Sequence, residues 1–379
     1  MRSRLRHSIW HPTRRPLLPG PPWLSTAAGR PGKFRRQTLH HLKVVLAGCG
    51  SMSGAWLKAA RTLPGVEIVG LVDIIEEAAR KRAHEFDLPN ASIGSDLRTI
   101  LEQTQPDAVF NCTIPEAHFE VSMLALQSGC HVLSEKPLAD SLEHARQIVD
   151  LAQQKGKIFS VIQNRRYDPH IRRVSAFLKT GTIGPFTTLN SDFYIGAHFG
   201  GFRDHMRHVL LLDMAIHTFD AARLLTGADP VAVYCKEWNP TGSWYDHDAS
   251  AVAIFEMTNN IIYTYRGSWC ANGLPTSWEA NWRVQGQEGS LQWDGGEQMQ
   301  AQVVAKTGDF ISRYRDVEIP AYNPQDAIGG HQGLIQEFVD CIKNGRTPET
   351  SGTDNIKSLA MVFGAIESAT TGQRVPIHY

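Results

Sequence analysis

Three short motifs have the residue types needed for chemistry on a hydroxyl group. A glycine-rich turn spans residues 48–54, Glu135-Lys136-Pro137 follows a later apolar run, and Asp213 and His217 open a predicted helix. The turn can hold a pyrophosphate. Lys, Asp and His are the groups needed to remove the proton of an alcohol. Together the motifs predict nicotinamide-linked oxidation of a hydroxyl group.

The glycine-rich turn has the neighbours that a dinucleotide-binding turn requires. Residues 42–47 predict a buried parallel strand and residues 55–61 predict a helix. Gly48 permits a tight bend, and Gly50 has no Cβ, so backbone amides at the helix N-terminus can approach a pyrophosphate. Ser53 stands where a third glycine is usual, but it is small enough for close packing of helix and strand.

Asp73 comes directly after the next predicted strand, residues 66–72. An acid at this place can accept hydrogen bonds from the ribose hydroxyls of NAD, whereas it would repel the 2′-phosphate of NADP. The following residue, Ile74, offers no cation. We therefore expect NAD rather than NADP as the cofactor. The alternative is that Asp73 only caps the helix that follows.

Strands and helices continue to alternate after Asp73, which predicts a doubly wound parallel sheet. Strands are expected at 107–113, 131–134 and 158–162, and helices at 76–86, 96–103, 118–126 and 142–155. The carboxyl ends of such strands face one crevice. The residues expected to bind the cofactor there are Gly48, Gly50, Ser51, Met52, Asp73, Thr113, Pro115, His118, Glu135 and Lys136.

Asp213 and His217 are four residues apart, so on a helix that ends at Gly227 they share a face. The alternative is an Asp that caps the helix and a His buried in the core. The residues expected to contact substrate are Arg166, Tyr167, His205, Asp213 and His217. A metal site built from nearby histidines is a weaker alternative, and we expect no metal.

The composition favours a globular protein that acts on small molecules. The 379 residues are 42% hydrophobic and 20% charged, which is ordinary for two globular domains. Residues 1–40 hold nine of the 38 Lys and Arg and none of the 38 Asp and Glu, so the rest carries a formal charge of −9. An acidic body argues against nucleic acid as a partner. No apolar stretch predicts a membrane span.

The cysteine pattern bears on the compartment. The six cysteines include no Cys-x-x-Cys pair, and several lie inside apolar runs. We expect a reducing, cytoplasmic location.

Residues 1–40 are rich in Arg and Pro, which predicts a disordered extension. Its twin arginines, Arg14 and Arg15, leave an export or transit signal open, although the prolines after them oppose both.

Taken together, the motifs resemble the glucose–fructose oxidoreductase/inositol dehydrogenase (Gfo/Idh/MocA) family over about residues 42–379. The resemblance includes the turn, Glu135-Lys136-Pro137, Asp213 with His217 and Asp220, and the closing stretch 337–372. Ser53 and Ala215 depart from the family pattern. The resemblance implies a Rossmann domain over 41–163 and, over 164–379, a substrate-binding and oligomerisation α/β domain with a large, mostly antiparallel open sheet.

The resemblance also implies that Lys136, Asp213 and His217 meet over the nicotinamide, and that the Lys136–Pro137 bond is cis. In this hypothesis His217 is the general base, Lys136 holds the substrate oxygen and Asp213 orients the substrate or Lys136. The expected substrate is a sugar, polyol or cyclitol, and the expected assembly is a homodimer or homotetramer. The alternatives are a reductase of aldehydes, ketones or diol-type substrates, and a sugar-responsive regulator without catalysis.

Overall fold

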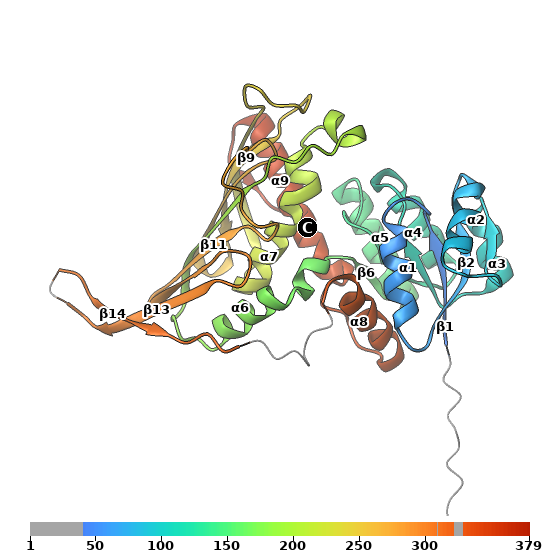
Figure 1. The fold of residues 1–379 in the computed structure, drawn as a ribbon, viewed down its shortest axis with the longest axis horizontal. Coiled ribbons are helices and arrows are strands. Elements are labelled where there is room, and N and C mark those ends of the chain that lie inside the picture. Colours follow the sequence, from blue (N-terminus) through green and yellow to red (C-terminus); the bar gives the residue numbers. More distant parts are fainter. Residues whose placement is uncertain (1–40, 309, 322–328) are drawn as a thin grey trace, which may run out of the picture. The chain divides into compact units, whose positions relative to one another are not determined.

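The computed structural model describes residues 41–308, 310–321 and 329–379 (Figure 1). The predicted basic extension, residues 1–40, lies outside the described residues. The described chain forms two β-sheets, one of six strands and one of nine. This confirms the predicted combination of a parallel sheet with a second, mostly antiparallel sheet.

The first sheet is entirely parallel, in the order β3-β2-β1-β4-β5-β6. Its strands are β1 (Leu42–Ala47), β2 (Val66–Val72), β3 (Ser92–Gly94), β4 (Ala108–Asn111), β5 (His131–Ser134) and β6 (Phe159–Val161). The direction of winding reverses between β1 and β4. In doubly wound sheets, ligands bind in the crevice at the carboxyl ends of the strands that flank this reversal.

Five helices alternate with these strands, as predicted. They are α1 (Ser53–Thr62), α2 (Glu76–Glu85), α3 (Leu97–Thr104), α4 (His118–Gln127) and α5 (Leu142–Lys155). Two of them have side-chain caps: the Asp96 carboxylate accepts from the Thr99 amide at 2.8 Å, and the Ser141 hydroxyl accepts from the His144 amide at 3.1 Å. These caps fix the starts of α3 and α5.

The sequence did not predict strand β3. It has only three residues, all half-buried, and it pairs with β2 at the edge of the sheet. A strand this short carries no hydrophobic period, so its sequence resembles a connecting loop.

The second sheet has the order β14-β13-β12-β11-β7-β10-β9-β8-β15. Its strands are β7 (Phe186–Tyr194), β8 (Pro230–Trp238), β9 (Ser250–Met257), β10 (Ile261–Ser268), β11 (Asn281–Gly286), β12 (Gly289–Trp293), β13 (Met299–Lys306), β14 (Arg313–Val317) and β15 (Val375–Pro376). The pair β7–β10 is parallel and the other pairs are antiparallel.

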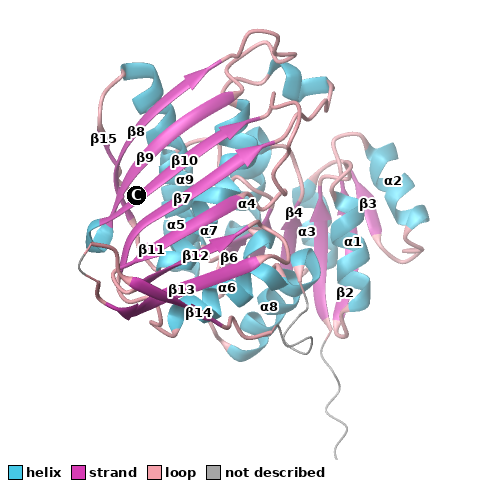
Figure 2. Ribbon diagram, turned by 60° about the vertical axis from the view of Figure 1, so that its left-hand side comes forward, coloured by secondary structure: helices cyan, strands magenta, loops and turns pink. Residues whose placement is uncertain are grey.

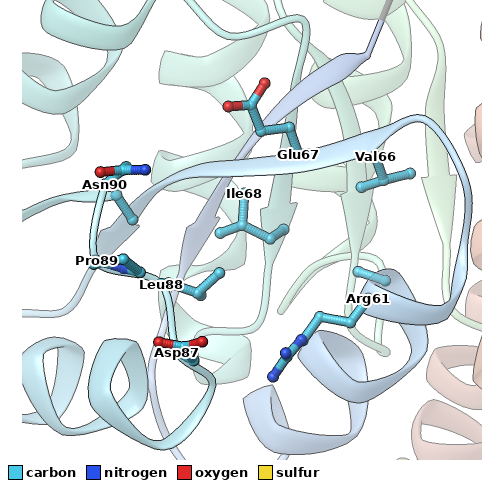
Figure 3. Close-up of a pocket in the computed structure, with 10 residues that line it drawn as sticks. Arg61, Val66, Glu67, Ile68, Asp87, Leu88, Pro89 and Asn90 are labelled. Carbon is cyan, nitrogen blue, oxygen red and sulfur yellow. The ribbon is translucent and has the colours of Figure 1, made fainter. Parts of the chain in front are cut away.

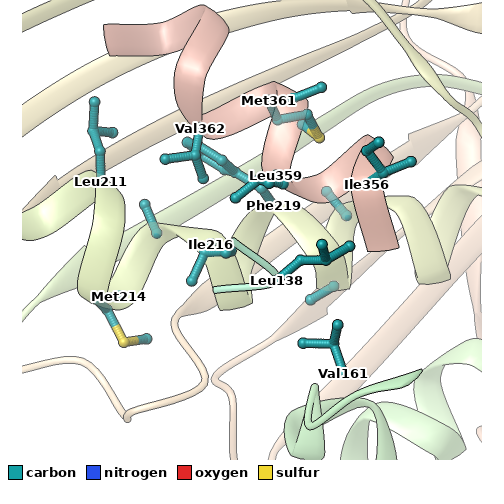
Figure 4. Packing of buried hydrophobic residues seen from close by; sticks show 14 of the residues in the cluster. Leu138, Val161, Leu211, Met214, Ile216, Phe219, Ile356, Leu359, Met361 and Val362 are labelled. Carbon is teal, nitrogen blue, oxygen red and sulfur yellow. The ribbon is translucent and has the colours of Figure 1, made fainter. Parts of the chain in front are cut away.

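One face of the nine-stranded sheet is covered by helices (Figure 2). They are α6 (Pro169–Lys179), α7 (Ile216–Thr226) and α9 (Gly352–Thr371). Figure 4 shows the packing between two of them, where Phe219 of α7 lies beside Leu359 and Val362 of α9. All three side chains are fully buried, so this contact anchors the helix that carries His217.

Helix α8 (Gly330–Asn344) belongs to the other core. Its residues Leu334, Ile335, Phe338 and Val339 lie in one buried cluster with residues of β1, α1 and β4. The rings of Phe110 and Phe338, for example, have centroids 6.3 Å apart. A late segment of the chain therefore completes the core under the six-stranded sheet. Within the described ranges, no helix combines the length and the apolar character needed to cross a membrane.

Candidate active site

The glycine-rich turn after β1 requires glycine at its first position. Gly48 has φ +90°, and a Cβ there would lie 2.5 Å from the carbonyl carbon of Cys112. The backbone after β1 thus passes against the backbone after β4. At Gly50 a Cβ would meet nothing within 4 Å, so the space beside this residue is open to a ligand. The turn therefore has the form of a pyrophosphate cradle at the N-terminus of α1.

Ser53 fills the position of the missing third glycine. It is fully buried, and its hydroxyl donates to the Gly50 carbonyl oxygen at 2.6 Å. The side chain thereby closes the first turn of α1 onto the loop. Ser51 and Met52 lie between these two residues and are exposed.

Asp73 follows β2 and stabilises the same turn. Its carboxylate accepts from the Cys49 amide at 2.7 Å and from the Ile75 amide at 2.9 Å. Arg82, on α2, donates to the Gly50 carbonyl oxygen at 2.8 Å. The sequence reasoning missed Arg82, because it lies nine positions after Asp73, inside the next helix. A carboxylate and a guanidinium therefore lie together beside the turn.

The residues after β4 form a tightly bonded corner. The Thr113 hydroxyl donates to the Asn111 side-chain oxygen at 2.6 Å, and Pro115 begins a short 3₁₀ turn, Pro115–Ala117. His118 is fully buried, with its ring nitrogens 2.7 Å from the Pro137 carbonyl oxygen and 3.1 Å from that of Thr113. Burial lowers the pKa of His118 despite these bonds. His118 thus ties the segments after β4 and β5 together.

Glu135 is buried directly after β5. Its carboxylate accepts from the indole N–H of Trp56, on α1, at 2.8 Å, and lies 3.9 Å from the His331 ring. Burial alone would raise its pKa, but the nearby His331 ring, the hydrogen bond from Trp56 and the charge of Lys136 bring it below its ordinary value. Glu135 is therefore an anion held inside the protein. The next peptide bond, Lys136–Pro137, is cis.

Lys136 contacts Asp213, which is 77 residues away in the chain. Its ammonium donates to the backbone carbonyl of Asp213 at 2.8 Å and to carboxylate oxygen Oδ1 at 3.1 Å. Arg203 binds the same carboxylate, with Nε 2.9 Å from Oδ2. Burial would raise the pKa of Asp213, but these two cations outweigh it and lower the pKa. The carboxylate is therefore ionised and fixed in place by two cations.

The sequence predicted that Asp213 opens a regular α-helix, and this prediction is wrong. Residues Leu210–Ala215 form a π-helical turn, and α7 begins at Ile216. The π turn inserts extra backbone before His217, and such turns are frequent at functional sites. Helix α7 ends at Gly227 in the left-handed conformation, as predicted.

His217, in the first turn of α7, is 8% exposed. Its Nδ1 atom lies 3.1 Å from the side-chain oxygen of Gln163. Burial, and then the charges of Arg165, Lys136 and His331, place the pKa of His217 well below its ordinary value. The imidazole is therefore neutral at neutral pH, which is the form that a general base requires. Sequence reasoning named His217 but not Gln163 or Arg165.

Two of the expected substrate residues have other partners. Arg166 is buried, and it binds both carboxylate oxygens of Asp220, at 2.6 and 2.7 Å, and the carboxylate of Asp354 at 2.7 Å. Tyr167 donates its hydroxyl to Glu337. These contacts join the 3₁₀ turn Asn164–Tyr167 to α7, α8 and α9, so the geometry gives Arg166 and Tyr167 structural partners and lends no support to their predicted contact with substrate.

His205 lies at the surface. Its ring is 2.5 Å from Asp246, and both side chains are more than half exposed. It belongs to a 3₁₀ turn, Gly201–His205, that also carries Arg203. The structure thus brings Arg203, rather than His205, to Asp213. Among the described residues, no group of three or more His, Cys, Asp or Glu side chains is placed to hold a metal ion.

A cavity of about 280 Å³ lies away from this chemistry (Figure 3). It is lined by the end of α1, the start of β2 and the segment between α2 and β3, including Arg61, Glu67 and Asp87. In a parallel sheet the starts of strands lie at the edge opposite to the ligand crevice. The cavity therefore plays no part in the proposed site.

Comparison with known proteins supports the same reading of the chain. Residues 42–163 match the sequence model described as "Oxidoreductase family, NAD-binding Rossmann fold", and residues 171–292 match that of the "GFO/IDH/MocA C-terminal domain". The chain is 27% identical to a D-apiose dehydrogenase of Paraburkholderia graminis, over 90% of this chain and 91% of that protein. It is 25% identical to a scyllo-inositol 2-dehydrogenase (NAD(+)) of Bacillus subtilis, over 89% and 96%.

Solved structures share the fold. An oxidoreductase from Agrobacterium radiobacter, in complex with NAD+, L-tartaric acid and magnesium, superposes with a TM-score of 0.77 at 22% identity, covering 89% of this chain and 98% of that one. A levoglucosan dehydrogenase in complex with NADH and levoglucosan gives 0.74 at 21% identity, covering 89% and 100%. With both sequence models matched along the chain, the protein belongs to the Gfo/Idh/MocA family of NAD-binding oxidoreductases.

Proposed function

We propose that the protein transfers a hydride between a hydroxyl group of an uncharged sugar, polyol or cyclitol and NAD. The observation that carries this proposal is the contact of the Lys136 ammonium with the Asp213 carboxylate, on a segment that presents a neutral His217 one helical turn later. A cation, an anion and a base are thereby gathered from two motifs that lie far apart in the sequence.

The three side chains divide the work on the hydroxyl group. Hydride leaves the carbon only as the hydroxyl proton is lost, and His217 is the base that accepts this proton. The Lys136 ammonium donates to the substrate oxygen and stabilises the negative charge that develops on it. Asp213 holds the ammonium in position. In the opposite direction, reduction of a ketone, the same His217 returns the proton.

The residues around the glycine-rich turn fit a dinucleotide. The open backbone at Gly50, the N-terminus of α1 and the Asp73 carboxylate match the pyrophosphate and ribose of NAD. Ser51, Met52, Thr113 and Pro115 complete the proposed binding residues, and His118 holds that corner in shape. Bound NAD+ would supply the hydride acceptor.

NAD in preference to NADP is part of this proposal. The Asp73 carboxylate would repel a 2′-phosphate, since both are negatively charged. Arg82 is a cation near the same turn, but its guanidinium already donates to the Gly50 carbonyl oxygen and contacts Glu85 at 2.7 Å. The Arg82 guanidinium is therefore already engaged by these two partners, and Asp73 determines the preference for NAD over NADP.

The charges of the site favour an uncharged substrate. Three cations of the site, Lys136, Arg165 and Arg203, each contact a carboxylate. Arg165 and Glu279 are 3.3 Å apart, and Lys136 and Arg203 share Asp213. Each of these three cations already has a carboxylate partner within the protein, so none of the three is reserved for a substrate carboxylate. The sugar and inositol substrates in the names of the relatives agree with this choice.

A homodimer or homotetramer, located in the cytoplasm, completes the proposal. In the part of the chain that the structure describes, no helix covers the second face of the nine-stranded sheet, and Tyr234, Trp238 and Ile254 are 41–49% exposed there. Burial of such apolar side chains against a second copy is favourable. All six cysteines are free, which agrees with a reducing compartment.

A substrate screen tests the proposal. Purified protein is incubated with NAD+ or NADP+ and a panel of uncharged sugars and cyclitols, with the corresponding sugar acids as matched competitors, and the reduced cofactor is followed by absorbance. We expect NADH with at least one uncharged compound and a slower reaction with its acid. Turnover confined to sugar acids would refute the proposed substrate class, and no turnover in either direction would favour a non-catalytic regulator.

A further inference from the structure

The side chain of Gln163, which comes after the last strand of the six-stranded sheet, contacts His217, the proposed base on α7. Gln163 follows β6, where its backbone N–H donates to Val161 at 2.8 Å and its carbonyl accepts from Arg166 at 3.1 Å. The side chain is 1% exposed, and its oxygen Oε1 lies 3.1 Å from Nδ1 of His217. The residue is therefore held on both sides of its backbone and has little freedom to leave the imidazole.

The identity of the partner atom decides where the imidazole proton lies. An amide oxygen only accepts hydrogen bonds, so the Nδ1 atom that faces it must carry the proton. A neutral imidazole has a single N–H, which leaves the lone pair on Nε2. Nε2 is then the atom that can accept a proton from a hydroxyl group.

An uncharged acceptor suits the charges that face this histidine. Arg165, Lys136 and His331 all disfavour the imidazolium, and burial acts in the same direction. A carboxylate in the place of Gln163 would offset the charges of Arg165 and Lys136 and make His217 more basic. The amide orients the ring without adding charge.

We propose that Gln163 is a positioning residue that fixes His217 in the Nδ1–H tautomer, so that Nε2 is the basic atom toward the substrate. This inference rests on the proposed function, which makes His217 the base. The hydrogen bond between Gln163 and His217 does not itself depend on catalysis. Rotation of the amide by 180° would present its N–H to Nδ1 and move the imidazole proton to Nε2, where it would block the base. The two arrangements are distinguishable by experiment.

The first measurement reads the tautomer directly. Two-bond ¹H–¹⁵N correlation spectra of the ¹⁵N-histidine-labelled full chain, without substrate, are recorded for the native protein and for His217→Gln to assign the ring. We expect a single Nδ1–H form in the native protein and an increased Nε2–H population in Gln163→Leu, which lacks the acceptor. An Nε2–H form in the native protein would overturn the proposal.

The second measurement uses a variant that keeps the acceptor. Gln163→Glu retains an oxygen beside Nδ1 and adds a charge, so the acid limb of kcat/KM for alcohol oxidation should move up by about one pH unit or more. Gln163→Leu should lower kcat roughly tenfold or more, because the wrong tautomer cannot accept the proton. The matched control is Gln154→Leu on the exposed surface of α5, which should leave both unchanged.

The outcomes separate this inference from the proposed function. An unshifted acid limb in Gln163→Glu, in a protein that still binds NAD+, would refute the role of Gln163. A native Nδ1–H tautomer together with a fully active His217→Ala variant would refute His217 as the base but would not contradict the hydrogen bond that His217 donates to Gln163.

Discussion

Lys136 binds Asp213 through two different oxygens, the backbone carbonyl at 2.8 Å and the carboxylate Oδ1 at 3.1 Å. The first contact fixes the ammonium relative to the π-helical turn that precedes α7, and the second neutralises part of the carboxylate. One bond thus depends on the backbone of residue 213 and the other on its side chain. Both join the segment after β5 to the helix that carries His217.

Removal of the Lys136 charge should impair turnover more than cofactor binding. In Lys136→Met the ammonium that stabilises the developing negative charge is lost, and kcat should fall by about 10²–10³-fold. Steady-state NADH formation measures kcat, and calorimetry measures the affinity for NAD+. Lys58→Met, an exposed change on α1, is the control. A Lys136→Met enzyme with native kcat would exclude Lys136 from the reaction.

The pH dependence of oxidation should reflect the lowered pKa of His217. The base acts in its neutral form, so a pKa well below the ordinary histidine value keeps it active as the pH falls through the range in which free histidine titrates. We therefore expect the acid limb of kcat/KM to lie below about pH 6.5. A limb at or above that value, measured with saturating NAD+, would contradict a lowered pKa of His217.

Asp73 should determine the choice between NAD and NADP. Asp73→Ser removes the charge that opposes a 2′-phosphate and leaves Arg82 beside the turn. The ratio of kcat/KM for NAD to that for NADP should fall by about tenfold or more, which corresponds to about 1.4 kcal/mol. Glu77→Gln, which removes an exposed negative charge four residues later, should leave the ratio near its native value. An unchanged ratio in Asp73→Ser would place the discrimination elsewhere.

The buried ion pair of Arg166 and Asp220 should matter for stability. Arg166→Met leaves the 2% exposed Asp220 carboxylate without its principal partner, and loss of one member of a buried pair costs about 3–5 kcal/mol in the free energy of unfolding. Urea unfolding measures the change. Arg374→Met breaks an exposed pair with Glu256 and should have a much smaller effect. Equal losses in the two variants would contradict the structural role of Arg166.

The sequence predicted the parts of the site that are formed by residues close together in the chain. The turn at Gly48 and Gly50, the acid at Asp73 and the pair Asp213 and His217 follow from spacing within one segment, whereas the approach of Lys136 to Asp213 was expected only from the family resemblance. The six-stranded sheet was predictable for the same reason, since buried strands and helices alternate with clear periods. β3 was missed because three half-buried residues have no period.

The contacts between distant side chains were not predictable from one sequence. The pairs Trp56–Glu135 and Gln163–His217 are separated by 79 and 54 residues, and nothing in their spacing indicates contact. Arg166 was assigned to the substrate because it precedes the motif region, whereas its partner Asp354 lies on α9, 188 residues later. The π turn before α7 was likewise not predicted, because the sequence pattern there is that of a regular helix.

The central claim is that His217 removes a hydroxyl proton while Lys136, held in position by Asp213, binds the substrate oxygen beside bound NAD. The most direct test is the single-turnover rate of NADH formation by His217→Ala, with the affinity for NAD+ measured on the same preparation. We predict a fall of about 10²-fold or more in the rate with native NAD+ affinity. A native rate in a His217→Ala enzyme that binds NAD+ normally would contradict the account.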